Sequence, residues 1–175
     1  MGKPLDGILV IDLSRVLAGP YCTMELADMG ATVVKIEIPG SGDDTRAYGP
    51  PFLHGESTYF MSVNRNKKSL TLNLKHAGGK EILRQLLQKG DVLVENFRPG
   101  TLDGLGFGYD AVHILNPKLI YCSISGFGQT GPYAQRPGYD LIAQAEGGVM
   151  SLTGEPDDAP VKVRLSFAAS TAGMN

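Results

Sequence analysis

The chain has 175 residues, of which 42% are hydrophobic and 19% are charged. A chain of this length and composition folds around a hydrophobic core rather than staying disordered. Its formal net charge is −2, and its basic residues form no run longer than Lys67-Lys68. These numbers exclude the broad basic surface that is typical of nucleic-acid-binding proteins. We expect one domain spanning residues 1–175.

The cysteines, the histidines and the start of the chain indicate which sites and which cellular compartment to expect. Cys22 and Cys122 lie far apart, each in an apolar segment, which favours two buried free thiols over a disulfide. The histidines are scattered and no pair of residues has the spacing of metal ligands, so no metal site is predicted. The chain start lacks a signal pattern, and no apolar run is long enough to span a bilayer. We expect a protein of the cytosol or the mitochondrial matrix, with no membrane partner.

Short apolar runs alternate with helical patterns along the chain, as a buried parallel sheet requires. The predicted strands are Ile8–Leu13, Thr32–Glu37, Ser69–Leu74, Asp91–Glu95 and Lys118–Ser125. The predicted helices are Gly19–Met29, Ala77–Lys89, Pro99–Phe107, Tyr109–Leu115 and Tyr139–Ala145, and the chain ends at Asn175 within the start of another. This alternation predicts an α/β fold with a Rossmann-like, doubly wound parallel sheet. Residues Ile38–Ser57, rich in Gly, Pro and Asp, predict a long loop.

Four loops follow the predicted strands, where ligands bind in open parallel sheets. They are Ser14–Pro20, Ile38–Arg46, Asn96–Gly100 and Gly126–Asp140. Each loop alone is equally consistent with an ordinary turn, but together they favour one shared cleft. The basic residues in or beside these segments are Arg15, Arg46, Arg65, Lys67, Lys68, Lys75, Arg98 and Arg136. They favour a phosphorylated or carboxylated small molecule as ligand.

Several common site motifs are absent. The stretch after the first strand reads SRVLAGP, which is not the GxGxxG fingerprint of dinucleotide-binding proteins. Neither the P-loop pattern GxxxxGK[ST] nor the GxSxG elbow of serine hydrolases occurs. The sequence therefore gives no support to a nicotinamide, flavin or P-loop nucleotide site.

Five stretches in order resemble the family III CoA transferases, the group of formyl-CoA transferase and the carnitine CoA-transferases. They are LDGILVIDLSRVLAGPYCT, GATVVKIEIPGSGDDTR, SVNRNKKSLTLNLK, DVLVENFRPGTLDGLGFGYD and IYCSISGFGQTGPYAQRPGYDLIAQAEGG. The stretches IPGSGDDTR and NRNKKS are most similar to members that use succinyl-CoA and a dicarboxylate. Family chains are about twice as long, with a large Rossmann-like domain and a smaller one, and two chains interlock as rings. The resemblance therefore implies that the smaller domain is missing here, and that the partner is a second copy or a separate C-terminal half.

The resemblance also implies a mechanism without a separately bound cofactor, in which CoA and acyl-CoA are substrates and a small carboxylic acid is the acceptor. An aspartate attacks the thioester to form a mixed anhydride, and the CoA thiolate then returns to give an enzyme thioester. The family's CoA-contacting positions fall on Leu17, Ala18, Leu72, Asn73, Leu74, Lys75, Asn96, Phe97 and Arg98. Asp140 falls where a second acidic residue assists.

The chain departs from the family at several of these positions. Ile38 and Gly104 stand where some members place arginines for the CoA phosphates. Pro137 stands where some place a lysine, and we expect the adjacent Arg136 to substitute for it.

The largest departure is at the catalytic nucleophile. The family's aspartate aligns with Ala169, and Arg164 stands where members commonly have glycine. A methyl group cannot attack a thioester, so we expect the chain as written to bind CoA but to be inactive alone.

Two alternatives remain open at this point. One is an acyl-CoA racemase of the same fold, which would need a basic histidine beside Asp140. The neighbour here is Tyr139, whose ordinary pKa of about 10 makes it a poor base at neutral pH. The other is a non-catalytic CoA-binding fragment or partner subunit, which the alanine at position 169 favours.

Overall fold

The computed structural model describes residues 2–155 and 157–174 and is built on a five-stranded parallel sheet. The strands are β1 (Leu9–Asp12), β2 (Thr32–Glu37), β5 (Lys67–Thr71), β6 (Val92–Glu95) and β7 (Ile120–Ser123), in the spatial order β5-β2-β1-β6-β7. Each neighbouring pair in this sheet is parallel. The predicted α/β fold with a doubly wound sheet is confirmed, and the strand order changes direction between β1 and β6.

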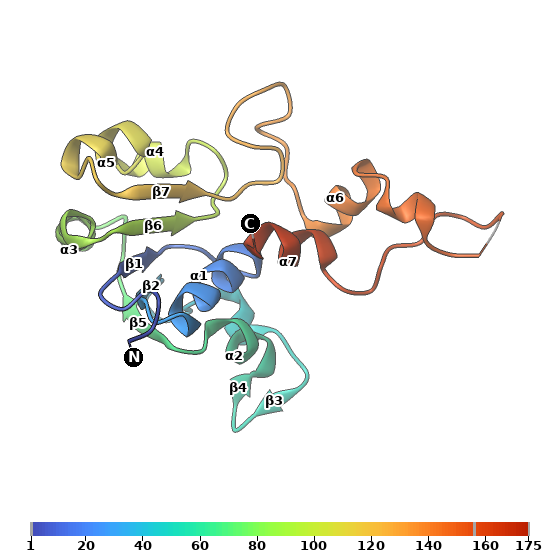
Figure 1. Ribbon diagram of the computed structural model, residues 1–175, viewed down its shortest axis with the longest axis horizontal. Helices are drawn as coiled ribbons and strands as arrows, with labels where there is room; N and C mark the ends of the chain where they lie inside the picture. Colours follow the sequence, from blue (N-terminus) through green and yellow to red (C-terminus); the bar gives the residue numbers. More distant parts are fainter. Residues whose placement is uncertain (1, 156, 175) are drawn as a thin grey trace.

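Helices cover both faces of the sheet (Figure 1). They include α1 (Ala18–Asp28) on one face, and α3 (Ala77–Lys89), α4 (Thr101–Leu105) and α5 (Tyr109–Leu115) on the other. Alternation along β1 explains the two layers, because Val10 packs in the cluster on the α1 side and Ile11 in the cluster on the α3 side. Both side chains are fully buried.

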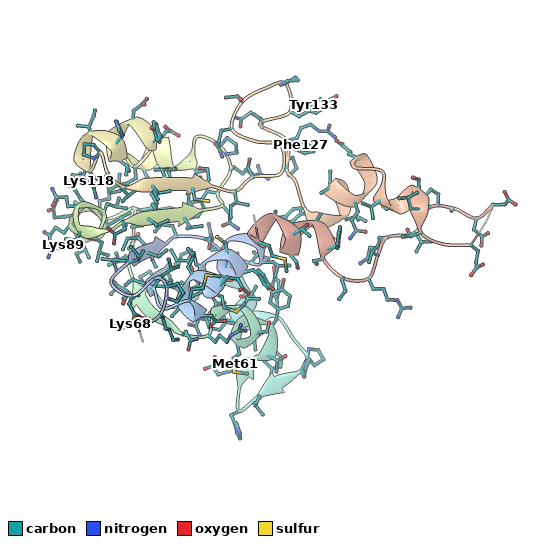
Figure 2. All side chains as sticks on the ribbon, in the orientation of Figure 1. Met61, Lys68, Lys89, Lys118, Phe127 and Tyr133 are labelled. Carbon is teal, nitrogen blue, oxygen red and sulfur yellow. The ribbon has the colours of Figure 1, made fainter. Side chains whose placement is uncertain are left out.

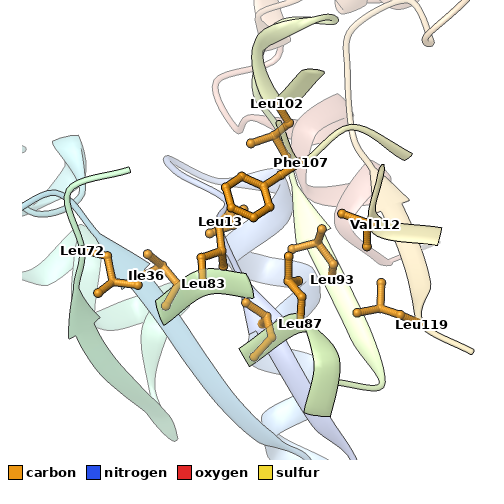
Figure 3. Packing of buried hydrophobic residues seen from close by; sticks show 11 residues of the cluster. Leu13, Ile36, Leu72, Leu83, Leu87, Leu93, Leu102, Phe107, Val112 and Leu119 are labelled. Carbon is orange, nitrogen blue, oxygen red and sulfur yellow. The ribbon is translucent and has the colours of Figure 1, made fainter. Parts of the chain in front are cut away.

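The larger core cluster lies between the sheet and α3 to α5 (Figure 3). Leu83 and Leu87 stand one helical turn apart on α3 and are both fully buried beside Leu93 of β6. Burial of each such leucine contributes about 1.5–3 kcal/mol. This packing sets where the carboxyl end of β6 lies.

The segment predicted as one long loop contains more structure than expected. It holds a 3-10 helix, η1 (Asp44–Ala47), and a short hairpin of β3 (Phe52–Leu53) and β4 (Glu56–Ser57), followed by the helix α2 (Thr58–Asn64). The helix α2 begins where the Ser57 hydroxyl accepts a hydrogen bond from the Phe60 N–H at 3.2 Å. Side-chain caps at Asp43 and Ser57 begin η1 and α2, and such capping leaves no apolar periodicity in the sequence.

The strand β5 begins and ends earlier than predicted, at Lys67 and Thr71 rather than Ser69 and Leu74. Lys67 is held in the sheet because its buried Nζ donates to Asp12 Oδ2 at 3.1 Å, to Asn64 Oδ1 at 2.9 Å and to the Pro20 carbonyl at 2.8 Å. This correction matters for the site, because it places Leu72–Lys75 in the loop at the carboxyl end of the strand.

The chain after β7 leaves the sheet as an arm and then returns (Figure 1). The arm contains the helices α6 (Asp140–Glu146) and η2 (Val149–Leu152), and the loop in which Phe127 and Tyr133 pack edge to face (Figure 2). The last helix, α7 (Phe167–Met174), packs on α1. A side chain at Gly173 would meet the Ala18 carbonyl at 2.5 Å, so glycine allows this close approach.

Both cysteines are free, as predicted, and both are partly buried. Within the described residues, no helix combines the length and the apolar character that crossing a membrane would require.

Candidate functional site

A cavity of about 500 Å³ opens at the carboxyl ends of β1, β2 and β5. Its walls are Leu13 and Arg15 after β1, the 35–43 segment of β2 and its following loop, the Leu72–Lys75 loop after β5, and Phe97 after β6. The helix α4 closes one side through Thr101, Gly104 and Leu105. A separate hollow of about 550 Å³ lies beside Tyr48 and Tyr59, away from the strand ends.

The predicted CoA-contacting residues divide into those that line the cavity and those that do not. Leu72, Asn73, Leu74, Lys75 and Phe97 all line it. Ile38 and Gly104, where the resemblance implies arginines in some family members, line it as well.

The other predicted positions lie elsewhere. Leu17 and Ala18 form the start of α1, and Arg98 is exposed beyond β6. Arg136 lies on the arm, where its Nη2 is 2.5 Å from Glu146 Oε1 and its guanidinium lies over the rings of Phe127 and Tyr133. None of these four residues is among those that line the cavity in the described structure.

Asn96 acts on the cavity through the backbone of Arg15. The Arg15 N–H donates to Asn96 Oδ1 at 2.8 Å, and Asn96 Nδ2 donates to the Arg15 carbonyl at 2.6 Å. This two-way clamp joins the loops after β1 and β6, where the strand order changes direction. Doubly wound sheets bind ligands at that position.

Glu95 supports the same loop from beneath. Its carboxylate is 5% exposed, accepts a hydrogen bond from the Phe97 N–H at 2.8 Å, and accepts another from the Ser123 hydroxyl. Burial raises the pKa of Glu95, because desolvation outweighs the two hydrogen bonds. The carboxylate therefore fixes the backbone of Phe97 and so the wall of the cavity.

Two charged residues that the sequence reasoning did not single out form the polar floor. Lys35 Nζ lies 2.9 Å from Asp43 Oδ2 and donates to the Ser14 carbonyl at 2.8 Å, and both side chains are at most 2% exposed. Asp43 Oδ1 accepts from the Val16 N–H at 3.4 Å. Burial alone would raise the pKa of Asp43, but Lys35 and the surrounding hydrogen bonds lower it. A lysine inside the apolar run TVVKIE is the signal that could have revealed this pair.

A second ion pair holds the loop after β2. Arg46 Nε and Nη2 donate to the two Glu37 carboxylate oxygens at 2.7 and 2.8 Å. Burial opposes ionisation of Glu37, but the bonds from Arg46, Ser69 and the Asp43 N–H outweigh it and lower the Glu37 pKa to about 2. Arg46 is therefore committed to Glu37 rather than to a ligand.

The predicted catalytic pair, Asp140 and Ala169, is brought together by the fold. Asp140 Oδ1 accepts a hydrogen bond from the Ala169 N–H at 3.0 Å. Ala169 lies on α7, which packs across α1 and contacts the start of α1 at Gly173. The structure thus joins the predicted nucleophile position to the acidic residue expected to assist it.

Gln144 organises this pair and was not predicted. Its side chain is fully buried, and its Nε2 donates to Asp140 Oδ2 at 2.6 Å and to the Leu165 carbonyl at 3.1 Å. Its Oε1 accepts from the Val163 N–H at 2.9 Å. One side chain therefore ties α6 to the segment that leads into α7.

Comparison with known proteins decides the family. The sequence signature of CoA-transferase family III matches residues 5–175.

The chain belongs to CoA-transferase family III.

Individual relatives agree with this assignment. Succinyl-CoA:glutarate CoA-transferase of Mus musculus is 51% identical over 172 residues, which are 98% of this chain and 39% of the relative. Succinate–glutarate CoA-transferase of Agrobacterium fabrum is 50% identical over 177 residues, covering 98% of this chain and 44% of the relative. The chain therefore spans about two fifths of the length of these family III relatives.

Solved structures agree as well. The crystal structure of a CAIB/BAIF family protein from Brucella suis superposes with a TM-score of 0.95 at 48% identity, and the match covers 99% of this chain and 47% of that one.

Among the described residues of this family III chain, no group of three or more His, Cys, Asp or Glu side chains could hold a metal ion.

Proposed function

We propose that this chain forms the CoA-binding part of an acyl-CoA:carboxylate CoA-transferase that uses succinyl-CoA and a dicarboxylic acid. The observation that carries the proposal is the cavity at the strand ends, because five of the predicted CoA-contacting residues line it. Its volume suits part of a CoA molecule, and its lining combines apolar residues such as Leu72 and Phe97 with the cations Arg15 and Lys75. The printed names of the relatives favour succinyl-CoA with glutarate.

The reaction needs a carboxylate at position 169. That carboxylate attacks the thioester carbonyl, the CoA thiolate leaves, and a mixed anhydride forms. The thiolate then attacks the aspartyl carbonyl and releases the donor acid, which gives an enzyme thioester. The acceptor acid attacks this thioester, which releases the CoA thiolate and forms a second mixed anhydride. The thiolate then attacks the acyl carbonyl of the acceptor, which gives the new acyl-CoA and frees the enzyme carboxylate.

The side chain of Ala169 is only a methyl group, so we propose that the chain binds CoA without transferring acyl groups. The remaining part of the site would come from a C-terminal half, in a longer chain or in a separate partner. The same alanine supports the alternative hypothesis that the chain is a non-catalytic, CoA-binding fragment or partner subunit.

The hypothesis that the chain is part of an acyl-CoA racemase has less support. Tyr139 is 74% exposed, and Asp140 is engaged by Gln144 and by the Ala169 N–H. No histidine stands beside this carboxylate in the sequence, so the base that a racemase needs is missing.

The test joins the chain to the C-terminal half of a close relative and follows glutaryl-CoA formation from succinyl-CoA and glutarate. With Ala169 we expect no transfer above background, and with Ala169→Asp we expect a gain of several orders of magnitude. Hydroxylamine should then convert residue 169 to a hydroxamate, detectable by mass spectrometry. The neighbouring substitution Ala168→Asp is the control and should give neither result. Equal transfer with Ala169 and Ala169→Asp would overturn the mechanism.

A further inference from the structure

Three cations line the cavity, namely Arg15, Lys35 and Lys75. Ile38 and Gly104, where the family resemblance implies arginines in some members, are uncharged and also line it. Lys35 also lines it but is neutralised by buried Asp43 at 2.9 Å. Among the described residues, Lys75 has no carboxylate within 4 Å, and Arg15 has one, the exposed Asp44 at 3.9 Å.

Arg15 is held in place without being neutralised. Its guanidinium carbon lies 4.9 Å from the centre of the Phe97 ring, a cation–π geometry. Its one acidic neighbour within 4 Å in the described structure is Asp44, at 3.9 Å and largely exposed, and an exposed pair at that distance interacts weakly. Its side chain is one-third exposed, so a ligand in the cavity can reach it.

The backbone beneath Arg15 is fixed as well. Asn96 bonds both the N–H and the carbonyl of Arg15, and Glu95 fixes Phe97 through its N–H. A guanidinium that is oriented before binding loses little conformational freedom when it binds an anion. Its planar fork also fits two oxygens of one phosphate.

We infer that Arg15 binds a phosphate group of CoA in this chain. Phosphate is the ligand chemistry that remains to be matched, because CoA carries a 5′-diphosphate and a 3′-phosphate and the cavity offers few other cations. The inference rests on the proposed CoA-binding function, which it extends to a named residue.

The experiment measures affinity by NMR titration of the chain itself with CoA, 3′-dephospho-CoA and pantetheine, which lacks all phosphates. Arg15→Ala should weaken CoA binding about 10- to 100-fold, the usual effect of losing a charge-assisted pair, and should leave pantetheine binding unchanged. Arg15→Lys should fall between, because it keeps the charge but loses the fork and the stacking. Asp44→Asn should change CoA binding little, because the exposed Arg15–Asp44 pair at 3.9 Å interacts weakly.

Dephospho-CoA shows which phosphate is bound. An equal loss for CoA and dephospho-CoA supports contact with the diphosphate, and a loss confined to CoA supports contact with the 3′-phosphate. Arg84→Ala, on the exposed face of α3 beside Glu81, is the matched control and should change nothing.

Three results would overturn the inference. CoA binding that is indifferent to Arg15→Ala, or a loss that is equally large for pantetheine, would overturn it and leave the proposed function standing. The absence of CoA binding by the unsubstituted, folded chain would overturn both together.

Discussion

The Asp140 carboxylate accepts a hydrogen bond from the Ala169 N–H at 3.0 Å, across 29 residues of chain. Ala169 is the third residue of α7, so Asp140 caps the helix at a position whose N–H has no partner within the helix. Asp140 therefore positions residue 169 whatever side chain stands there.

Asp140→Ala should loosen the start of α7. Loss of a cap costs about 0.5–2 kcal/mol, so we expect faster amide hydrogen exchange at residues 169 to 172, with the α3 amides unchanged. Asp140→Asn keeps an acceptor oxygen and should show a smaller effect. Unchanged exchange in Asp140→Ala would mean that α7 is held by its packing on α1 alone.

Gln144→Leu should release the segment before α7. The leucine keeps the volume but cannot bond the Val163 N–H or the Leu165 carbonyl, so the link between this segment and α6 is lost. We expect faster tryptic cleavage after Lys162 and Arg164. Gln85→Leu, at an exposed glutamine of α3 that bonds exposed Glu81, should leave cleavage unchanged. Equal cleavage in both variants would contradict the role assigned to Gln144.

Glu37 should make stability depend on pH in the acid range. Its pKa is about 2 in the fold against an ordinary 4.5, so its contribution is fully present above pH 4.5 and is lost as the pH falls toward 2. Glu37→Gln should therefore lower the free energy of unfolding by on the order of 2–3 kcal/mol at pH 7, and this gap should close near pH 2.

Urea unfolding at several pH values measures this gap. Glu56→Gln is the matched control, because Glu56 also lies near Arg46, at 3.6 Å, but is mostly exposed. A gap for Glu37→Gln that stays constant from pH 7 to pH 2 would show that Glu37 acts by packing rather than by charge.

Cys22 should react slowly in the folded chain. Burial, followed by the nearby Cys122 and Asp12, raises the pKa of its thiol to about 11. At pH 8 only about one thiol in a thousand is then ionised, and the thiolate is the reactive form. We expect slow modification by a disulfide reagent until urea unfolds the chain. Rapid reaction of the folded protein would contradict this environment.

The elements that the sequence predicted well are those whose signal is local. The bounds of α3 and α5 agree with the predicted ones, because apolar residues at helical spacing face the core in both. The alternation of short apolar runs and helices predicted the doubly wound parallel sheet, but it did not predict the strand order β5-β2-β1-β6-β7.

The site was predictable only in part, because its polar contacts join distant segments. Nothing in the sequence around Gln144 indicates that it would bond residues 19 and 21 positions further on. The pairing of Lys35 with Asp43, and the clamp of Asn96 on Arg15, likewise depend on how loops from different strands meet. Strand β5 was shifted because Lys67, a charged residue, is buried by partners from two other elements.

The central claim is that CoA occupies the cavity at the strand ends, and chemical-shift mapping of CoA on the isotope-labelled chain tests it most directly. We expect saturable shifts at the amides of Leu72–Lys75, Asn96 and Phe97, which lie at that end of the sheet. We expect no comparable shifts at Tyr48 and Tyr59 beside the second hollow. A folded sample with no shifts at millimolar CoA, or with shifts confined to the second hollow or the arm, would contradict it.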